Sequence, residues 1–371
     1  MSSDLRSPTS VLRGLRVSIV TGTLGQGGAE NQLFLIASTL EREGATVQVI
    51  SLTKGEFWEK PLREHNVAVD FVGESRFRLR RLMEIIAAAR KFRPHVLQSQ
   101  HYYVNAYAAI AARVCRIPSV GAVRGDGTAD FDSCGHVFRR LNMHLPHLLA
   151  INSRAAMRKM HSFGCPESKL YYLPNVIDLA RFKRKNQRGN GVPMIVGVGR
   201  MGPEKRFDFF LEVIFQWRQK RRAPVRACLV GDGPLRKELE ERAGRLGLLD
   251  GSVHFYGSVK DIVPIYREAD LLMLTSDREG TPNVIMEAMA CGLPVVATAV
   301  GDVPELVSHE TSGFVFPVDD LAGFLGAVEK LMNNQPLRES MGCHGHSFIQ
   351  GNHELGLLST FLAHLYARAL S

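Results

Sequence analysis

The chain has 371 residues, of which 45% are hydrophobic and 22% are charged, and this length and composition suit a soluble globular protein of two domains. No apolar run approaches the length that a membrane-spanning helix needs, and the polar residues 1–13 lack the apolar segment of a signal peptide. We therefore expect neither a transmembrane helix nor a signal peptide. The six cysteines lie far apart without metal-site spacing, so we interpret them as reduced thiols of a cytoplasmic protein.

The positive charge is unevenly distributed along the chain. The net charge is +9, and the first 180 residues carry 23 Lys and Arg against 15 Asp and Glu, whereas the remaining residues carry 23 against 22. A basic half favours contact with phosphates of nucleic acid, with an anionic membrane or with an acidic substrate. The charge alone does not choose among these three.

The first predicted element is a β-branched strand over residues 15–21, followed by a glycine turn and an amphipathic helix to about residue 43. The turn contains Gly27, Gly28 and Glu30. A strand, glycine turn and helix form the layout that binds phosphate at a helix N-terminus, and a tight turn without a ligand is the alternative. Glu30 stands where the dinucleotide fingerprint needs its third glycine, which disfavours a nicotinamide-dependent oxidoreductase.

A cluster of basic residues surrounds the helix predicted over residues 77–92, after strands at 46–52 and 67–72. Its members are Arg76, Arg78, Arg80, Arg81, Arg90, Lys91 and Arg93. A solvated helix face is the usual explanation of such a run. Because Phe77 and Leu79 are interleaved with the arginines, a membrane-surface role is the alternative.

Polar residues follow the next two predicted strands, over residues 95–99 and 119–123. These residues are His101, Asn105, Arg124 and Asp126. Polar groups at strand ends are candidates for a binding site, although each alone is more often a turn or capping residue. Strands over 148–152 and 170–173 complete the first predicted domain.

A polar, basic stretch over residues 181–191 predicts a linker, after which the second domain begins as the first did. A strand over 194–198 leads into a glycine turn that Arg200 and Lys205 bracket. Two cations at such a turn would hold a pyrophosphate, Arg as a fork and Lys as a point charge, with two solvated surface charges as the alternative. Further strands then alternate with helices, which predicts an α/β fold with parallel, doubly wound sheets.

Two glutamates, Glu279 and Glu287, stand eight positions apart across a predicted loop-to-helix junction. Thr281 suits the N-cap of the helix and Pro282 its first position. The outward backbone amides of this junction would form an anion site, so that the two acids and the amides together suit a nucleotide sugar. For Glu287 alone, stabilisation by the helix dipole is an equal alternative.

These motifs together resemble the retaining glycosyltransferases of family 4, which have the GT-B fold. The motifs are Glu279 to Glu287 with seven residues between them, Gly199-Arg200 with Lys205, Val230 to Pro234, Pro174-Asn175 with Asp178, and Gly27-Gly28-Ala29-Glu30. The resemblance covers the chain from about residue 15 onward. It implies two Rossmann-like domains that face each other across a cleft, with the C-terminal helix returning to the N-terminal domain. The expected parts are a tail at 1–14, an acceptor domain at 15–180, a linker at 181–192, a donor domain at 193–350 and a returning helix at 351–371.

The resemblance implies a hexosyltransferase that moves a sugar from a UDP- or GDP-sugar to a glycan, a lipid-linked or another cell-envelope acceptor, as in polysaccharide or lipopolysaccharide biosynthesis. Transfer would retain the anomeric configuration, with no metal and no cofactor besides the nucleotide sugar. Arg200 and Lys205 would bind the pyrophosphate, Glu279 the sugar ring and Glu287 the ribose. The implied donor site also includes Gly199, Val259, Gly280, Thr281, Pro282, Asn283 and Val284. The implied acceptor and phosphate loop comprises Gly27, Gly28, His101, Asn105, Arg124 and Asp126.

The chain departs from the family pattern at two places. Many relatives carry a histidine where this chain has Arg124, which suggests a different donor sugar or acceptor phosphate contact and leaves the histidine's role to Arg124, Asp126 or His101. The usual Gly-Gly pair is Gly301-Asp302 here, so that the Asp302 side chain is expected to crowd or bond the sugar pocket. The basic first half favours an anionic acceptor and a peripheral site on the cytoplasmic membrane face.

Three other functions stay open at the level of sequence. A GT-B-fold sugar-nucleotide epimerase would form product without an acceptor, and a non-catalytic nucleotide- or sugar-binding protein would show no turnover. A nucleic-acid-binding protein would use the basic half alone, but the chain has no recognised nucleic-acid-binding module. We therefore expect no nucleic-acid partner.

Overall fold

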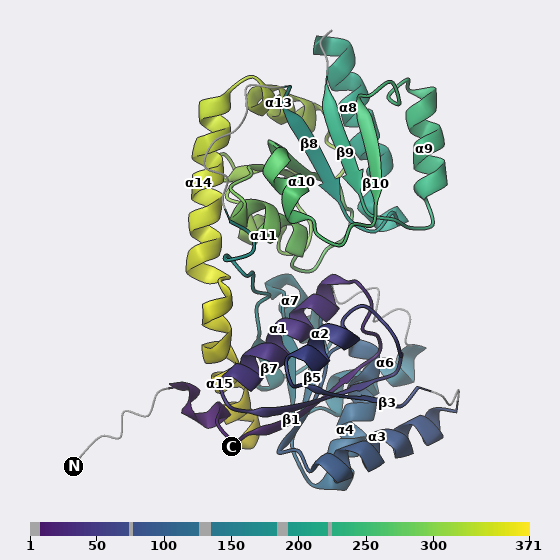
Figure 1. Ribbon diagram of the computed structural model, residues 1–371, viewed down its shortest axis with the longest axis vertical. Coiled ribbons are helices and arrows are strands. Elements are labelled where there is room, and N and C mark those ends of the chain that lie inside the picture. The colour runs from purple at the N-terminus through teal and green to yellow at the C-terminus, as the bar shows by residue number, and fades with distance from the viewer. Residues whose placement is uncertain (1–7, 74–76, 126–134, 184–191, 222–224) are drawn as a thin grey trace, which may run out of the picture. The chain divides into compact units, whose positions relative to one another are not determined.

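The protein is described from a computed structural model, shown in Figure 1, and the chain divides into two compact units. The first unit contains the chain up to Val176 together with Leu355–Ser371, and the second contains Ile177–Glu354. The residues that the structure describes are 8–73, 77–125, 135–183, 192–221 and 225–371. Each unit is an α/β domain with its own parallel sheet.

The first unit is built on a seven-stranded parallel sheet in the order β3-β2-β1-β4-β5-β6-β7. The strands are β1 Arg16–Thr21, β2 Thr46–Ser51, β3 Ala68–Phe71, β4 Val96–Ser99, β5 Ser119–Val123, β6 Leu148–Ile151 and β7 Leu170–Tyr172. The strand order reverses between β1 and β4, which is where open α/β sheets bind their ligands. The helices are α1 Gly28–Arg42, α2 Glu59–Glu64, α3 Arg78–Phe92, α4 Asn105–Cys115, α6 Gly135–His144, α7 Arg154–Ser162 and α15 Leu358–Leu370.

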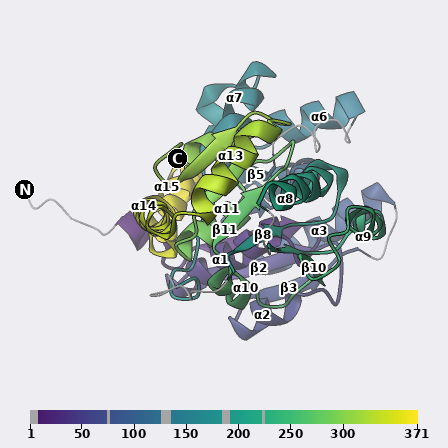
Figure 2. The same ribbon diagram turned by 90° about the horizontal axis from the view of Figure 1, so that it is seen from above.

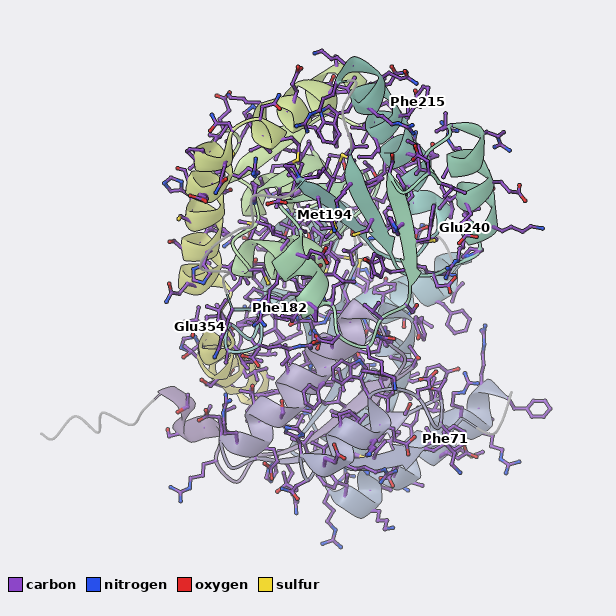
Figure 3. All side chains as sticks on the ribbon, turned by 45° about the horizontal axis from the view of Figure 1, so that its top comes forward. Phe71, Phe182, Met194, Phe215, Glu240 and Glu354 are labelled. Atoms are coloured by element: carbon purple, nitrogen blue, oxygen red, sulfur yellow. The ribbon has the colours of Figure 1, made fainter. Side chains whose placement is uncertain are left out.

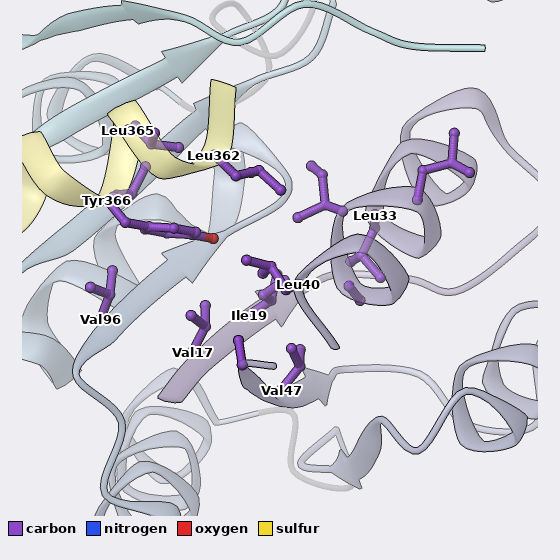
Figure 4. Packing of buried hydrophobic residues seen from close by; sticks show 14 of the residues in the cluster. Val17, Ile19, Leu33, Leu40, Val47, Val96, Leu362, Leu365 and Tyr366 are labelled. Carbon is purple, nitrogen blue, oxygen red and sulfur yellow. The ribbon is translucent and has the colours of Figure 1, made fainter. Parts of the chain in front are cut away.

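The central strands of this sheet are buried on both faces, which explains why they are nearly continuous apolar runs. Figure 4 shows one face, where Val17 and Ile19 of β1 meet Leu33 of α1 and Leu362 of α15. Helices α3 and α4 cover part of the opposite face. The final helix therefore completes the core of the first unit, although the chain reaches α15 only after passing through the second unit.

The second unit is built on a six-stranded parallel sheet in the order β10-β9-β8-β11-β12-β13. The strands are β8 Met194–Val198, β9 Arg226–Val230, β10 Val253–Gly257, β11 Leu271–Leu274, β12 Val295–Thr298 and β13 Gly313–Phe316. The helices are α8 Phe207–Arg221, α9 Arg236–Arg245, α10 Val263–Glu268, α11 Asn283–Ala290, α12 Val303–Leu306, α13 Leu321–Met332 and α14 Gln335–Asn352. Helices α8 and α13 pack on one face of the sheet, and α10 and α11 pack on the other (Figure 2).

The predicted α/β class is confirmed, with two doubly wound parallel sheets and the terminal helix on the first unit. The two units meet in sequence at Val176 and Ile177, before the stretch 181–192 that was predicted as the linker. Ile177 and Phe182 belong to the second core together with Met194, and all three side chains are apolar and buried. Figure 3 labels Phe182 and Met194. Residues 184–191 of the predicted linker lie outside the described residues.

One predicted helix start is wrong by one position. Helix α11 begins at Asn283, with Pro282 as its N-cap, whereas the sequence predicted Thr281 as the cap. The Thr281 hydroxyl donates instead to the carboxylate of Asp302, at 3.0 Å. Separately, no helix within the described ranges is both long and apolar enough to cross a membrane.

Candidate active site

Two glycine turns meet at the carboxyl ends of β8 and β9 in the second unit. Gly231 has φ +132, and a Cβ on it would lie 1.9 Å from the carbonyl oxygen of Gly199. The Gly199 amide donates to the carbonyl oxygen of Val230 at 2.9 Å, so the two turns are fastened together. Only glycine fits at position 231, because any side chain would displace the neighbouring turn. This close approach fixes the backbone that carries Arg200.

The Arg200 side chain is exposed, and no partner for it is found among the described residues. Lys205, at the end of the same turn, has a partner in Glu279. Its Nζ donates to Oε1 of Glu279 at 2.6 Å, and the two side chains are only 18% and 11% exposed. The structure thus brings together two predicted site residues that are 74 positions apart.

The loop that carries Glu279 is clamped at several points. The Ser276 hydroxyl donates to the Oε1 atom that Lys205 also contacts, at 2.6 Å. The amide of Asp277 donates to the carbonyl oxygen of Glu204 at 3.0 Å, which ties the loop to the turn before Lys205. A carboxylate that accepts from both a lysine and a hydroxyl is oriented before any ligand arrives. Ser276 was not predicted as a site residue, although it lies only three residues before Glu279.

The turn after β12 presses against the same loop. Gly301 has φ +54, and a Cβ on it would lie 2.1 Å from the carbonyl oxygen of Glu279. The amide of Asp302 donates to the carbonyl oxygen of Gly280 at 2.9 Å, and its carboxylate accepts the hydroxyl of Thr281. Asp302 is 2% exposed. The expectation that Asp302 crowds or bonds a sugar is therefore wrong, because its buried side chain braces the loop.

Helix α11 begins directly after this loop, so its N-terminus lies at the end of the loop. Its N-cap residue, Pro282, makes no side-chain cap hydrogen bond, so the cap side chain does not neutralise the positive end of the helix dipole. Gly280, Thr281, Pro282, Asn283 and Val284, the residues of the predicted donor site, pass from the loop into the first turn of the helix, and their contact with a donor stays a prediction. Val259, the other predicted donor residue, is half-buried against the core that contains α10 and α11.

Glu287 lies one turn further along α11, where its half-buried side chain accepts a hydrogen bond from Tyr266 Oη at 3.0 Å. Burial raises the pKa of the Glu287 carboxyl to about 7, although the Tyr266 bond and the charge of Arg181 both act to lower that pKa. Asp261 pairs with Arg181 at 3.1 Å. Glu287 is therefore partly protonated near neutral pH, which its position on the helix did not predict.

In the first unit, His101 and the glycine turn after β1 are joined by Glu30. Oε1 of Glu30 lies 3.0 Å from Nε2 of His101, and a Cβ on Gly27 would lie 2.2 Å from Oε2 of Glu30. The amide of Gly22 donates to Nδ1 of His101 at 3.2 Å, so Nε2 carries the ring proton and donates to Glu30. Gly28 begins α1. In the sequence, Glu30 was noted for standing in place of a glycine, and its pairing with His101 was not predicted.

Asn105 does not belong to an open acceptor loop, which corrects the prediction. The residue is fully buried, and its Oδ1 accepts from the Ser99 hydroxyl and from the amide of Ala122. Its Nδ2 donates to the carbonyl oxygens of Ala122 and Asn142, at 3.1 Å and 3.2 Å. Because these bonds use both side-chain atoms, Asn105 fastens α4 to β5 and has no group left for a ligand.

Arg124 directly follows β5. Its Nε and Nη2 atoms are buried and have no hydrogen-bond partner among the described residues. Burial lowers the pKa of the Arg124 guanidinium to about 10. Asp126, the remaining residue of the predicted acceptor loop, lies outside the described residues. Within those residues, no three His, Cys, Asp or Glu side chains gather in a way that could hold a metal ion.

Two family models match consecutive parts of the chain. The model described as Glycosyltransferase Family 4 matches residues 26–181, and the model described as Glycosyl transferases group 1 matches residues 192–334. The chain belongs to the family 4 glycosyltransferases. The matched ranges include the His101–Glu30 pair in one model and the Lys205–Glu279 pair in the other.

This family 4 glycosyltransferase is similar to curated proteins over part of its length. It is 33% identical over 118 residues to the N-acetyl-alpha-D-glucosaminyl L-malate synthase of Bacillus anthracis, covering 32% of this chain and 31% of that protein. It is 30% identical over 159 residues to the lipopolysaccharide core biosynthesis glycosyltransferase LpsE of Rhizobium meliloti, covering 43% and 45% of the two chains. The chain thus spans less than half of the length of each of these two relatives.

The fold of this family 4 glycosyltransferase matches a solved structure along nearly all of both chains. The Anabaena protein Alr3699/HepE, determined in complex with UDP and glucose, aligns with a TM-score of 0.83. The alignment covers 95% of this chain and 99% of that one, at 20% sequence identity. The GT-B fold expected from the sequence is therefore confirmed.

Proposed function

We propose that the protein is a retaining glycosyltransferase that takes a sugar from a nucleoside-diphosphate sugar, held mainly by the second unit. The observation that carries this proposal is the Lys205–Glu279 pair, oriented by Ser276 beside the turn of Arg200. A cation, a carboxylate and a helix N-terminus together suit a ligand that has phosphates at one end and hydroxyls at the other. The Anabaena protein was determined with UDP and glucose bound, which supports a uridine donor as the first to be tested.

Each group has a separate role in this proposal. Arg200 and Lys205 neutralise the charge that develops on the leaving diphosphate, with the N-terminus of α11 assisting. Glu279 accepts hydrogen bonds from the donor sugar, and Glu287 accepts them from the ribose. Neither carboxylate transfers a proton. Fixed cations supply the charge stabilisation, so the reaction is expected to proceed without a metal ion, and the nucleotide sugar is the co-substrate.

A thermal-shift panel of UDP, GDP and their sugars, followed by a turnover assay with the preferred donor, tests this proposal. Lys205→Ala is expected to lower turnover by about a hundredfold or more, as expected when a preorganised charge is lost. Lys237→Ala is the matched control, because Lys237 is 91% exposed on α9, and this variant should keep full activity. No thermal shift with any nucleotide, in a folded sample, would reject the proposal.

Further measurements distinguish a retaining transferase from the alternative functions. The anomeric configuration of the product, followed by NMR during turnover, should match that of the donor. Turnover should survive EDTA. Product formation without an acceptor would indicate an epimerase, and donor binding that never leads to turnover would indicate a binding protein. The double variant Glu279→Gln with Glu287→Gln should weaken donor binding as well as turnover, and normal donor affinity would contradict the two assignments.

We also propose that the first unit meets an anionic membrane surface, where a lipid-linked acceptor would be presented. Helix α3 and the residue before it carry exposed apolar side chains, with Phe77 79%, Leu79 69% and Met83 54% exposed. The Arg78 guanidinium lies 4.4 Å from the ring centroid of Phe138 on α6, next to Val137, which is 70% exposed. Apolar side chains interleaved with arginines fit the interface of an anionic bilayer. Arg76, predicted as part of this cluster, lies outside the described residues.

Vesicle sedimentation tests the membrane proposal. Binding should increase with the fraction of anionic lipid, and it should fall when Arg78 and Arg80 are both replaced by Glu. Lys237→Glu is the control for a general change in charge, since α9 belongs to the second unit. Binding that ignores the anionic lipid content, or that is unchanged by the double replacement, would contradict the proposal.

A further inference from the structure

Arg124 is a half-buried cation without a counter-ion among the described residues of the first unit. It follows β5 at the carboxyl edge of the sheet, and part of the residue is exposed while its Nε and Nη2 atoms are shielded from solvent. The charge of Arg124 and the Tyr366 hydroxyl of α15 influence each other electrostatically. Tyr366 in turn donates to Oε1 of Gln98 at 2.7 Å. The guanidinium therefore lies near a polar group of the core and not in open solvent.

The surrounding polar atoms leave an excess of hydrogen-bond donors. Nε2 of Gln98 joins the two Arg124 nitrogens as a buried donor without a partner among the described residues. Oε1 of Gln100 is the buried acceptor left unpaired on the same strand end, where Nε2 of Gln100 donates to the carbonyl oxygen of Ala29. Gln98 lies in β4, and Gln100 directly follows this strand. A neutral amide oxygen does not compensate the charge of a guanidinium.

Two other arginines of the chain show how carbonyl oxygens accept from a structural guanidinium, although Nε of Arg338 is also buried without a hydrogen-bond partner among the described residues. Arg338 is 5% exposed, and its Nη1 donates to the carbonyl oxygens of Leu331 and Met332, at 2.7 Å and 3.2 Å. Arg368 donates to the carbonyl oxygen of Leu170, at 3.2 Å. Arg124 makes no such bond within the described residues. Shielded guanidinium nitrogens that lack hydrogen-bond partners are costly in the free protein, which favours a partner that a ligand supplies.

We propose that Arg124 binds an anionic group, a carboxylate or a phosphate, carried by a sugar-containing substrate at the carboxyl edge of the first sheet. This inference rests on the proposed glycosyltransferase function and adds the charge of the substrate to it. The place fits such a ligand. Gln100 ties the end of β4 to the first turn of α1, so that Arg124 lies along the same strand-end edge as His101 and the Gly27 turn. This edge includes the point between β1 and β4 where the strand order reverses.

Binding measurements on the full chain test the inference in two arms. The acceptor arm compares glucuronate and glucose 6-phosphate with glucose, in the presence of UDP. The donor arm compares UDP-glucuronate with UDP-glucose. The wild-type protein should prefer the charged ligand by about tenfold or more in at least one arm, since a guanidinium and an oxyanion form a charge-assisted pair. The arm that shows the preference identifies whether the anion belongs to the acceptor or to the donor sugar.

Arg124→Gln should abolish that preference and leave the affinity for the neutral ligand nearly unchanged. Arg113→Gln is the matched control, because Arg113 is an exposed arginine of α4 and this variant should keep the preference. Without ligand, Arg124→Gln should unfold at the same or a higher temperature than the wild type, since the variant removes an uncompensated charge. A marked loss of thermal stability would show a structural role and overturn the inference.

Equal affinity of the wild type for charged and neutral ligands in both arms would also overturn the inference. This result needs no variant, so a folding defect cannot obscure it. If UDP still binds in that case, only the inference about Arg124 fails. If no nucleotide binds at all, the proposed function fails first, and the two failures are therefore distinguishable.

Discussion

Replacing Glu287 by Gln should make the stability of the protein less dependent on pH. Burial raises the pKa of Glu287 from 4.5 to about 7 in the folded protein. The folded state therefore binds more protons than the unfolded state between pH 4.5 and pH 7, and the free energy of unfolding falls as the pH rises through this window. The destabilisation is absent below pH 4.5 and is fully present above pH 7.

The size of this effect follows from the pKa shift. A rise of about 2.5 units, at 1.36 kcal/mol per unit, corresponds to at most about 3 kcal/mol of lost stability above pH 7. A glutamine at this position has no charge to bury, and its carbonyl oxygen can still accept the hydrogen bond from Tyr266. Glu287→Gln should therefore stabilise the protein by up to about 3 kcal/mol at pH 8 and have little effect at pH 4.5.

Thermal unfolding of the wild type and the variant, measured at intervals from pH 4.5 to pH 8, checks the prediction. For a unit of this size, 3 kcal/mol corresponds to a difference in Tm of roughly 6–12 °C. The difference should open between pH 5 and pH 7 and then stay constant. A difference that does not change with pH would refute the reasoning, because it would show that the Glu287 carboxyl does not titrate abnormally.

The same carboxyl also predicts a linkage between donor binding and proton release. If ribose hydroxyls donate to Glu287, they favour its ionised form, so UDP binding near pH 6 should release a fraction of a proton. Calorimetry in two buffers of different ionisation enthalpy measures this release. The wild type should show a buffer-dependent binding enthalpy, and Glu287→Gln should lose that dependence. Two packing predictions concern the two units separately. Gly301→Ala should lower both turnover and Tm, because a Cβ would lie 2.1 Å from the carbonyl oxygen of Glu279 at a positive φ. Gly326→Ala is the control: its Cβ would meet nothing within 4 Å in the middle of α13, so turnover should be unchanged and Tm should be equal or slightly higher, because alanine favours a helix over glycine. Normal activity of Gly301→Ala would show that the loop does not need this contact. Leu362→Ala should lower the free energy of unfolding by about 2–5 kcal/mol in urea, since Leu362 is fully buried on α15. Leu370→Ala, at a position that is 44% exposed, should cost much less, and equal losses would contradict the packing of α15.

The sequence alone predicted those features of the protein that depend on short-range patterns. Apolar strands that alternate with amphipathic helices along the chain indicated α/β domains with parallel sheets. The hydrophobic periods of strands and helices are local properties of the chain, so they can be recognised without the fold. The glycine turns after residues 21 and 198, and the seven-residue spacing between Glu279 and Glu287, indicated where ligand-binding groups would lie. The errors at this level were small, such as the helix start at Asn283, where the Thr281 hydroxyl bonds to Asp302 instead of capping the helix.

Only the tertiary structure decided how the functional groups are held. Lys205 meets Glu279 across 74 positions, and Glu30 meets His101 across 71, and no local period encodes contacts of that separation. Asn105 was a reasonable site candidate until folding used both ends of its side chain. Arg124, which the sequence showed only as a departure from the family pattern, is a half-buried guanidinium whose Nε and Nη2 atoms have no hydrogen-bond partner among the described residues. The burial of a side chain and its hydrogen-bond partners depend on strands and helices that come from distant parts of the chain. The chemistry of these side chains therefore follows from the fold and not from the order of residues.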